Sequence, residues 1–123
     1  MRIEPLGPTC GVRIEGVDAA RLDDVAFAEI YRLFLDRYVV ALRGQRLDEE
    51  QTIALSRRFG PLEPHVLKEF HHQRHPEILM LSTVADAGKP KGLADAGSYW
   101  HSDVSYKARP SRASALYAVE VPA

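Results

Sequence analysis

The chain has 123 residues, of which 46% are hydrophobic and 27% charged, and its formal net charge is −1. This is the composition of one ordinary globular domain with room for a core, and it excludes a disordered or low-complexity chain. Because the charge is balanced, the sequence predicts no surface for nucleic acid or for an anionic membrane. The single cysteine, Cys10, allows no intramolecular disulfide, and no apolar run has the length of a signal peptide or a membrane span. We therefore expect a soluble, cytoplasmic protein.

The first forty residues predict two short strands and one helix. Residues 3–16 hold two strand candidates interrupted by glycine and proline, and residues 12–15 alternate apolar and polar side chains as a half-buried strand does. Asp23 or Asp24 is expected to cap a helix that runs to about Arg37. Its apolar stripe, at helical spacing, consists of Phe27, Ile30, Tyr31, Phe34 and Leu35.

A buried strand and a second helix are expected next. Residues 38–43 form a short, β-branched run that is typical of a buried strand. Asp48, with Gln51 three positions later, forms a capping-box pattern that starts a helix, and Gly60–Pro61 ends it. The predicted inward face of this helix consists of Thr52, Leu55 and Phe59.

The second half of the chain predicts loops between further strands. Residues 62–76 hold four of the five histidines (His65, His71, His72 and His75) and predict a loop with one helical turn. Residues 85–98 have no periodicity and predict a mobile connection of the kind that often covers a binding site. Strands are predicted over residues 78–83, 99–106 and 113–121, with a turn at 107–112. Because a final strand without successors leaves an unpaired edge, the sequence looks interrupted at Ala123, either as a natural truncation or as a fragment.

The pair His101 and Asp103 is the clearest candidate for chemistry. In a strand, residues i and i+2 point to the same face, so an imidazole and a carboxylate would lie side by side. One histidine nitrogen and one carboxylate oxygen are two thirds of the facial triad of non-haem Fe(II) oxygenases. By itself, however, such a pair is more often a hydrogen-bonded pair at the surface.

The segments around this pair extend the comparison to most of the chain. Together they resemble, in order, the taurine dioxygenase / 2,4-D dioxygenase (TauD/TfdA) family of Fe(II)- and 2-oxoglutarate-dependent oxygenases. The matching segments are Ile3–Gly7, Gly11–Asp18, Tyr38–Gln45, Arg58–His65 and Trp100–Tyr106. The Gly/Asp-rich loop before the last of these and the Ala115–Pro122 strand after it also fit the family.

The resemblance implies an α+β protein, a partial double-stranded β-helix (jelly-roll) with flanking N-terminal helices. Residues 1–123 would be one C-terminally truncated dioxygenase domain. It also implies oxidative decarboxylation of 2-oxoglutarate to succinate and CO₂, coupled to hydroxylation of a C–H bond by O₂. His101 and Asp103 would be the first two Fe(II) ligands, and association into a homo-oligomer would be typical of the family.

The same resemblance implies residues that the sequence lacks. The family's third ligand is a histidine far downstream, and the arginine that pairs with 2-oxoglutarate lies beyond it; neither has a counterpart before Ala123. We therefore expect that these 123 residues alone are inactive. Two alternatives are a non-catalytic remnant or association module, and a binding module whose histidine-rich loop holds zinc, although zinc would require closure by four N/S donors.

The substrate-binding candidates come from the resemblance as well. His65 matches a family position where a histidine contacts an anionic group of the substrate, which implies a small anionic organic substrate. Tyr99 shares a strand face with His101 and is expected to line the pocket, whereas Trp100 is expected to pack in the core. Lys68 and Gly97 stand where taurine-binding members carry a tyrosine and an asparagine, and this difference argues against taurine itself.

Overall fold

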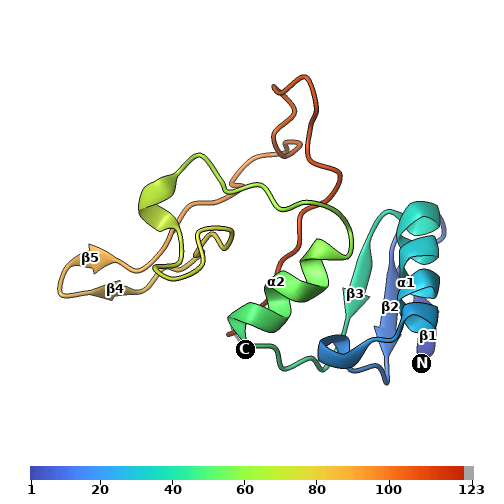
Figure 1. The fold of residues 1–123 in the computed structure, drawn as a ribbon. Coiled ribbons are helices and arrows are strands. Elements are labelled where there is room, and N and C mark those ends of the chain that lie inside the picture. The colour runs from blue at the N-terminus through green and yellow to red at the C-terminus, as the bar shows by residue number, and fades with distance from the viewer. Residues whose placement is uncertain (121–123) are drawn as a thin grey trace. The chain divides into compact units, whose positions relative to one another are not determined.

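The computed structural model describes residues 1–120, which fall into two compact units. The N-terminal unit is residues 1–55, and the C-terminal unit is the chain from residue 56 onward. Regular helices and strands are concentrated in the first unit, and the second consists mostly of irregular chain (Figure 1). Within the described residues, no helix is long and apolar enough to cross a bilayer.

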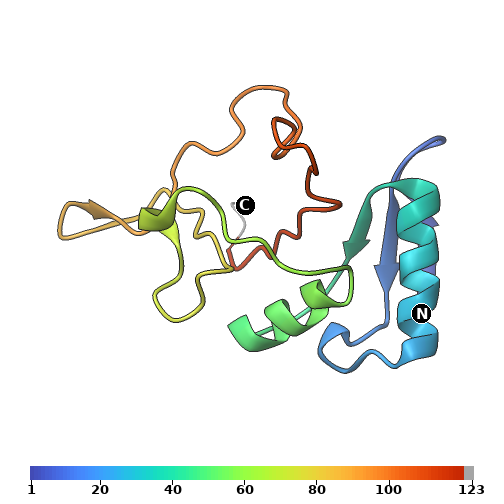
Figure 2. The same ribbon diagram turned by 45° about the horizontal axis from the view of Figure 1, so that its top comes forward.

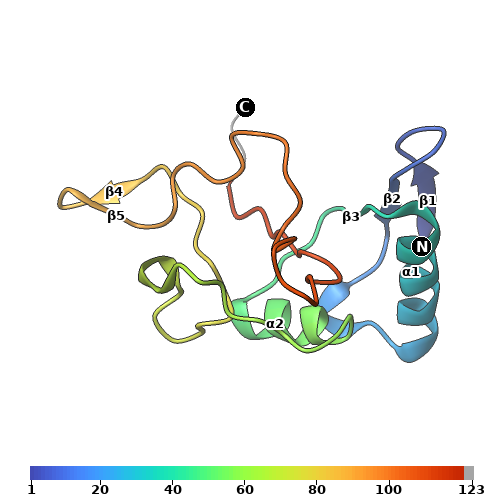
Figure 3. The same ribbon diagram turned by 90° about the horizontal axis from the view of Figure 1, so that it is seen from above.

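The N-terminal unit is built on a three-stranded sheet of order β1-β2-β3. Strand β1 (Arg2–Pro5) pairs antiparallel with β2 (Val12–Glu15), and β2 pairs in parallel with β3 (Val40–Leu42). The parallel pair requires a crossover, and helix α1 (Asp24–Arg37) supplies it. Figure 3 shows α1 running beside β2 and β3.

Both ends of α1 follow from the sequence. The side chain of Asp23 accepts a hydrogen bond from the Ala26 amide at 2.7 Å, as an N-cap does. The helix ends at Arg37, and Tyr38 then adopts a φ of +65°, so the predicted strand begins only at Val40. The buried core of this unit consists of Val12, Ile14, Ala19, Ile30, Leu33 and Ile53.

The capping box predicted at Asp48 is present. The Asp48 side chain accepts from the Gln51 amide at 2.7 Å, and the Gln51 side chain accepts from the Asp48 amide at 2.9 Å. Helix α2 (Glu49–Arg57) follows and ends before Gly60–Pro61, as expected. The predicted inward face was wrong, because Ile53 is the buried residue, whereas Thr52, Leu55 and Phe59 are only half-buried.

The secondary structure in the first part of the C-terminal unit agrees only partly with the prediction. The predicted helical turn is present as the 3₁₀ helix Lys68–Phe70. The strand predicted over residues 78–83 is reduced to two isolated bridges, at Leu79 and Leu81. A hairpin of β4 (Ala85–Asp86) and β5 (Lys89–Pro90) forms where an irregular connection was expected, and Figure 2 shows it as a narrow loop.

The strand predicted over residues 99–106 was also wrong. Residues 103–106 form a turn, and Val104 has a φ of +53°, a region that a β-branched residue rarely adopts. Residues 113–120 are irregular as well, and the last residue of that predicted strand, Val121, lies outside the described residues. The α+β class is confirmed. The jelly-roll stays a prediction, because strands β1–β5 form only a three-stranded sheet and a hairpin.

Candidate metal centre and substrate loop

His101 and Asp103 lie together although no strand holds them. The His101 Nε2 and Asp103 Oδ1 atoms are 3.2 Å apart, and the two side chains are 39% and 51% exposed. Two donors that each lie about 2.1 Å from one metal ion, at right angles to each other, are about 3 Å apart. The spacing of these two atoms therefore fits adjacent ligands of one metal ion.

The second nitrogen of His101 supports the same use. The carbonyl oxygen of Tyr99 can only accept, so the Nδ1–H of His101 donates to it, at 2.8 Å. In the neutral ring this leaves the lone pair on Nε2, on the side of Asp103. Metal-binding histidines commonly donate their other N–H to a backbone carbonyl in this way, which fixes the tautomer and the ring orientation.

The same contacts change the protonation of His101. The hydrogen bond to Tyr99, and after it the Asp103 carboxylate, raise the pKa of the imidazole above its ordinary value. In the charged form of the ring Nε2 also carries a proton, which a metal ion would have to displace.

Asp103 has a different partner for each oxygen atom. Oδ1 faces His101, and Oδ2 accepts a hydrogen bond from the hydroxyl of Ser114. Ser114 was not among the residues that the sequence predicted for the site. It lies 11 positions away in a segment predicted as a strand, and no local pattern links a serine to a carboxylate at that distance.

The residues before His101 border it closely. The rings of Tyr99 and His101 are 5.4 Å apart between centroids, so Tyr99 lies beside the candidate ligand. A side chain at Gly97 would approach the His101 ring to 3.0 Å, and its φ of +75° also favours glycine. A shallow hollow of about 240 Å³ is lined by Gly97, Ser98, Tyr99 and Trp100. The prediction that Trp100 packs in the core was wrong, because its side chain is fully exposed.

His65 is oriented by two hydrogen bonds of its own loop. Its Nδ1 accepts from the Leu67 amide at 3.2 Å, and its backbone oxygen accepts from the Nε2–H of His71 at 2.6 Å. Because Nδ1 acts as an acceptor, the proton of the neutral His65 ring is on Nε2. Within residues 1–120, His65 shares no hydrogen bond with His101 or Asp103, so the structure does not join it directly to the pair.

An ion pair connects the segments that carry these candidates. The Lys107 ammonium donates to Glu63 Oε2 at 2.8 Å, and the carboxylate raises the pKa of Lys107. Glu63 lies two positions before His65, and Lys107 lies four positions after Asp103. Lys68 is exposed at the start of its 3₁₀ helix.

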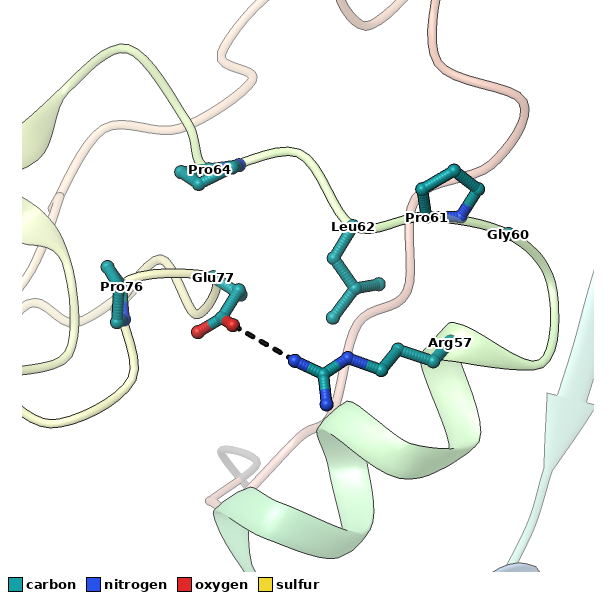
Figure 4. Close-up of a pocket in the computed structure, with 7 residues that line it drawn as sticks. All are labelled: Arg57, Gly60, Pro61, Leu62, Pro64, Pro76 and Glu77. Atoms are coloured by element: carbon teal, nitrogen blue, oxygen red, sulfur yellow. Dashed lines mark hydrogen bonds and ion pairs between the residues drawn. The ribbon is translucent and has the colours of Figure 1, made fainter.

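A second hollow of the C-terminal unit lies beside the same loop. It measures about 510 Å³ and is open to solvent. Figure 4 shows the Arg57 guanidinium and the Glu77 carboxylate facing each other within it, at 3.2 Å. Its remaining lining residues are Gly60, Pro61, Leu62, Pro64 and Pro76. Neither candidate metal ligand is among them, so this hollow does not mark the metal centre.

No group of three or more potential metal ligands occurs in the part of the chain that the structure describes. His72 and His75 stack at 5.3 Å between ring centroids, in the histidine-rich loop. The alternative of a closed zinc site there gains no support, because such a site needs four converging donors. The imidazole–carboxylate pair thus has the donor types and the spacing of two of the three protein ligands in a non-haem Fe(II) facial triad.

Comparison with known proteins agrees with this class. A model of the "Taurine catabolism dioxygenase TauD, TfdA family" matches residues 2–123. The chain belongs to this family of dioxygenases. It is 37% identical over 123 residues to pentalenolactone F synthase of Streptomyces arenae, with 96% of this chain and 39% of the relative aligned. It is 33% identical to the alpha-ketoglutarate-dependent 2,4-dichlorophenoxyacetate dioxygenase of Cupriavidus pinatubonensis, with 96% and 45% aligned.

A solved structure is similar as well. A Burkholderia xenovorans protein, assigned as an alpha-ketoglutarate-dependent taurine dioxygenase, matches with a TM-score of 0.55 and 37% identity. The match covers 61% of this chain and 27% of that one. The chain thus spans less than half the length of each of these relatives.

Proposed function

We propose that the protein is an Fe(II)- and 2-oxoglutarate-dependent dioxygenase that hydroxylates a small anionic organic substrate. The observation that carries the proposal is the His101–Asp103 pair, with 3.2 Å between its donor atoms and a carbonyl-bound second nitrogen on the histidine. The membership of the TauD/TfdA family supports it. The domain would be a jelly-roll in a cytoplasmic enzyme that associates into a homo-oligomer.

In this proposal, His101 Nε2 and Asp103 Oδ1 hold Fe(II), and further ligands complete the site in the whole protein. Fe(II) held there would supply the O₂ chemistry, in which one oxygen atom of O₂ would end in succinate, formed with CO₂ from 2-oxoglutarate, and the other in the hydroxyl group of the product. The residues of this chain orient the metal ligands through Tyr99 and Ser114 and leave open coordination positions for the two co-substrates.

The substrate would bind through His65 and beside Tyr99. The Nε2–H of His65 is a donor suited to a carboxylate or sulfonate, and the hydrogen bond from the Leu67 amide to Nδ1 orients the ring before the substrate arrives. The 2,4-dichlorophenoxyacetate named for one relative is such an anion with an aromatic body. The aromatic face of Tyr99 next to His101 supports a substrate of this kind.

Anaerobic addition of Fe(II) and 2-oxoglutarate to the protein at its natural length tests the proposal. A complete site is expected to give a visible metal-to-ligand charge-transfer band. His101→Ala should abolish the band. His75→Ala is the matched control, because it removes a histidine that stacks on His72 and is no candidate ligand, and it should leave the band unchanged. If the natural-length protein gives no band, it is not an oxygenase of this type, and a non-catalytic association module becomes the better explanation.

A further inference from the structure

We propose that Ser114 is a positioning residue that keeps one oxygen of Asp103 away from the metal. This inference rests on the proposed function, since it concerns the same metal centre. It is carried by the hydrogen bond from the Ser114 hydroxyl to Asp103 Oδ2.

The two oxygens of the carboxylate are divided between two partners. Oδ1 lies 3.2 Å from His101 Nε2, where a shared metal ion would bind, and Oδ2 is taken by Ser114. A carboxylate that is free to rotate can present both oxygens to one metal ion. With Oδ2 engaged by a hydroxyl donor, Asp103 is expected to bind with Oδ1 alone.

Single-oxygen binding matters for the proposed reaction. A facial triad works by leaving three coordination positions open for co-substrate and O₂. A carboxylate bound through both oxygens would occupy one of these positions. Ser114 would therefore preserve an open position, and it would do so without adding a charge to the site.

Cobalt(II) is a suitable probe because its visible absorption reports both binding and coordination number. The natural-length protein, Ser114→Ala and Ser114→Thr would each be titrated with Co(II) under anaerobic conditions. Ser105→Ala is the matched control, because it removes a hydroxyl from the turn at residues 103–106 without touching the Ser114–Asp103 hydrogen bond. Far-ultraviolet circular dichroism would confirm that all variants are folded.

Loss of a hydrogen-bond partner of a metal ligand typically weakens metal affinity or activity by about 10- to 100-fold. We expect Ser114→Ala to show a loss of this size together with a changed Co(II) spectrum, and Ser114→Thr and Ser105→Ala to match the unaltered protein. A merely structural role would leave the Co(II) spectrum of the bound form unchanged.

Two outcomes overturn the inference and are distinguishable. If Ser114→Ala binds Co(II) with the affinity and spectrum of the unaltered protein, Ser114 does not position Asp103, while the proposed function stands. If the unaltered protein itself binds no Co(II), both the metal centre and the role of Ser114 are refuted.

Discussion

Replacing His65 with asparagine or glutamine separates the roles of its two ring nitrogens. The amide of asparagine reaches about as far as Nδ1, so His65→Asn can keep the hydrogen bond from the Leu67 amide. The amide of glutamine reaches about as far as Nε2, so His65→Gln can keep a donor for an anionic substrate. If His65 binds substrate through Nε2–H, the asparagine variant should lose substrate affinity and the glutamine variant should retain most of it.

The size of the effect follows from the charge of the substrate. A hydrogen bond to a charged group contributes about 1.5–3 kcal/mol, and each 1.4 kcal/mol is a factor of ten in affinity. His65→Asn is therefore expected to raise KM by roughly 10- to 150-fold with little change in kcat. The bond to the Leu67 amide, between neutral groups, is worth about 0.5–1.5 kcal/mol, so His65→Gln should cost about tenfold or less.

The assay is substrate-dependent consumption of 2-oxoglutarate by the natural-length protein. The substrate would be the small carboxylic or sulfonic acid that stimulates consumption most strongly in a panel that includes aryloxyacetates. His71→Gln controls for the loop, because it alters the contact to the His65 carbonyl and leaves the His65 ring in place. Equal KM values for His65→Asn and the unaltered protein would refute the assignment of His65 as a substrate-binding residue. So would a rise in KM for His65→Gln as large as that for His65→Asn.

The N-terminal unit permits three independent checks of stability. Ile30 is 0% exposed, so Ile30→Ala should lower the unfolding free energy in urea by about 2–5 kcal/mol, whereas Leu35→Ala, at a position 57% exposed, should cost clearly less; equal losses would contradict the described core. Asp48→Ala removes one half of the capping box and should cost about 1 kcal/mol in the same assay; no loss would mean that the box contributes nothing. Hydrogen bonds from arginine side chains lower the pKa values of Glu4 and Asp18 in the folded protein. A carboxyl group of this kind stabilises the fold when the pH is above its pKa in the unfolded chain. This stabilisation is lost as the pH falls through its lower pKa in the folded protein. Stability should therefore decline below about pH 4.5, the ordinary value for Glu4, and Glu4→Gln should make this decline shallower; an identical acid profile would refute the contribution.

The sequence predicted the elements whose hydrogen bonds are local. Helix α1 with its Asp23 cap and the Asp48–Gln51 capping box are both present. Each depends on side chains within a few positions of one another, which a periodic pattern or a capping motif records. The exception is the inward face of α2, where Ile53 is buried, because the burial of a short helix depends on neighbours that its own sequence does not specify.

The strands predicted in the C-terminal unit depended on partners far away in the chain. A strand is stable only when its backbone groups pair with another strand. Over residues 99–106 the sequence predicted a strand, but no ladder partner for it occurs among residues 1–120. The chain forms a turn there instead, with Val104 at a positive φ. A local sequence pattern can therefore favour a strand, but whether the strand forms depends on a partner strand elsewhere in the chain.

The candidate site shows how two side chains can be predicted to be neighbours from the wrong backbone conformation. His101 and Asp103 were expected to be neighbours because a strand places residues i and i+2 on one face. In the structure they are neighbours because His101 is held by the Tyr99 carbonyl and Asp103 by the Ser114 hydroxyl. The spacing of two residues is short enough that both a strand and a turn bring the side chains together. The motif was enough to select His101 and Asp103 as candidates. Ser114 was found only from its contact with Asp103 in the structure, and substituting Ser114 tests what orients the Asp103 carboxylate.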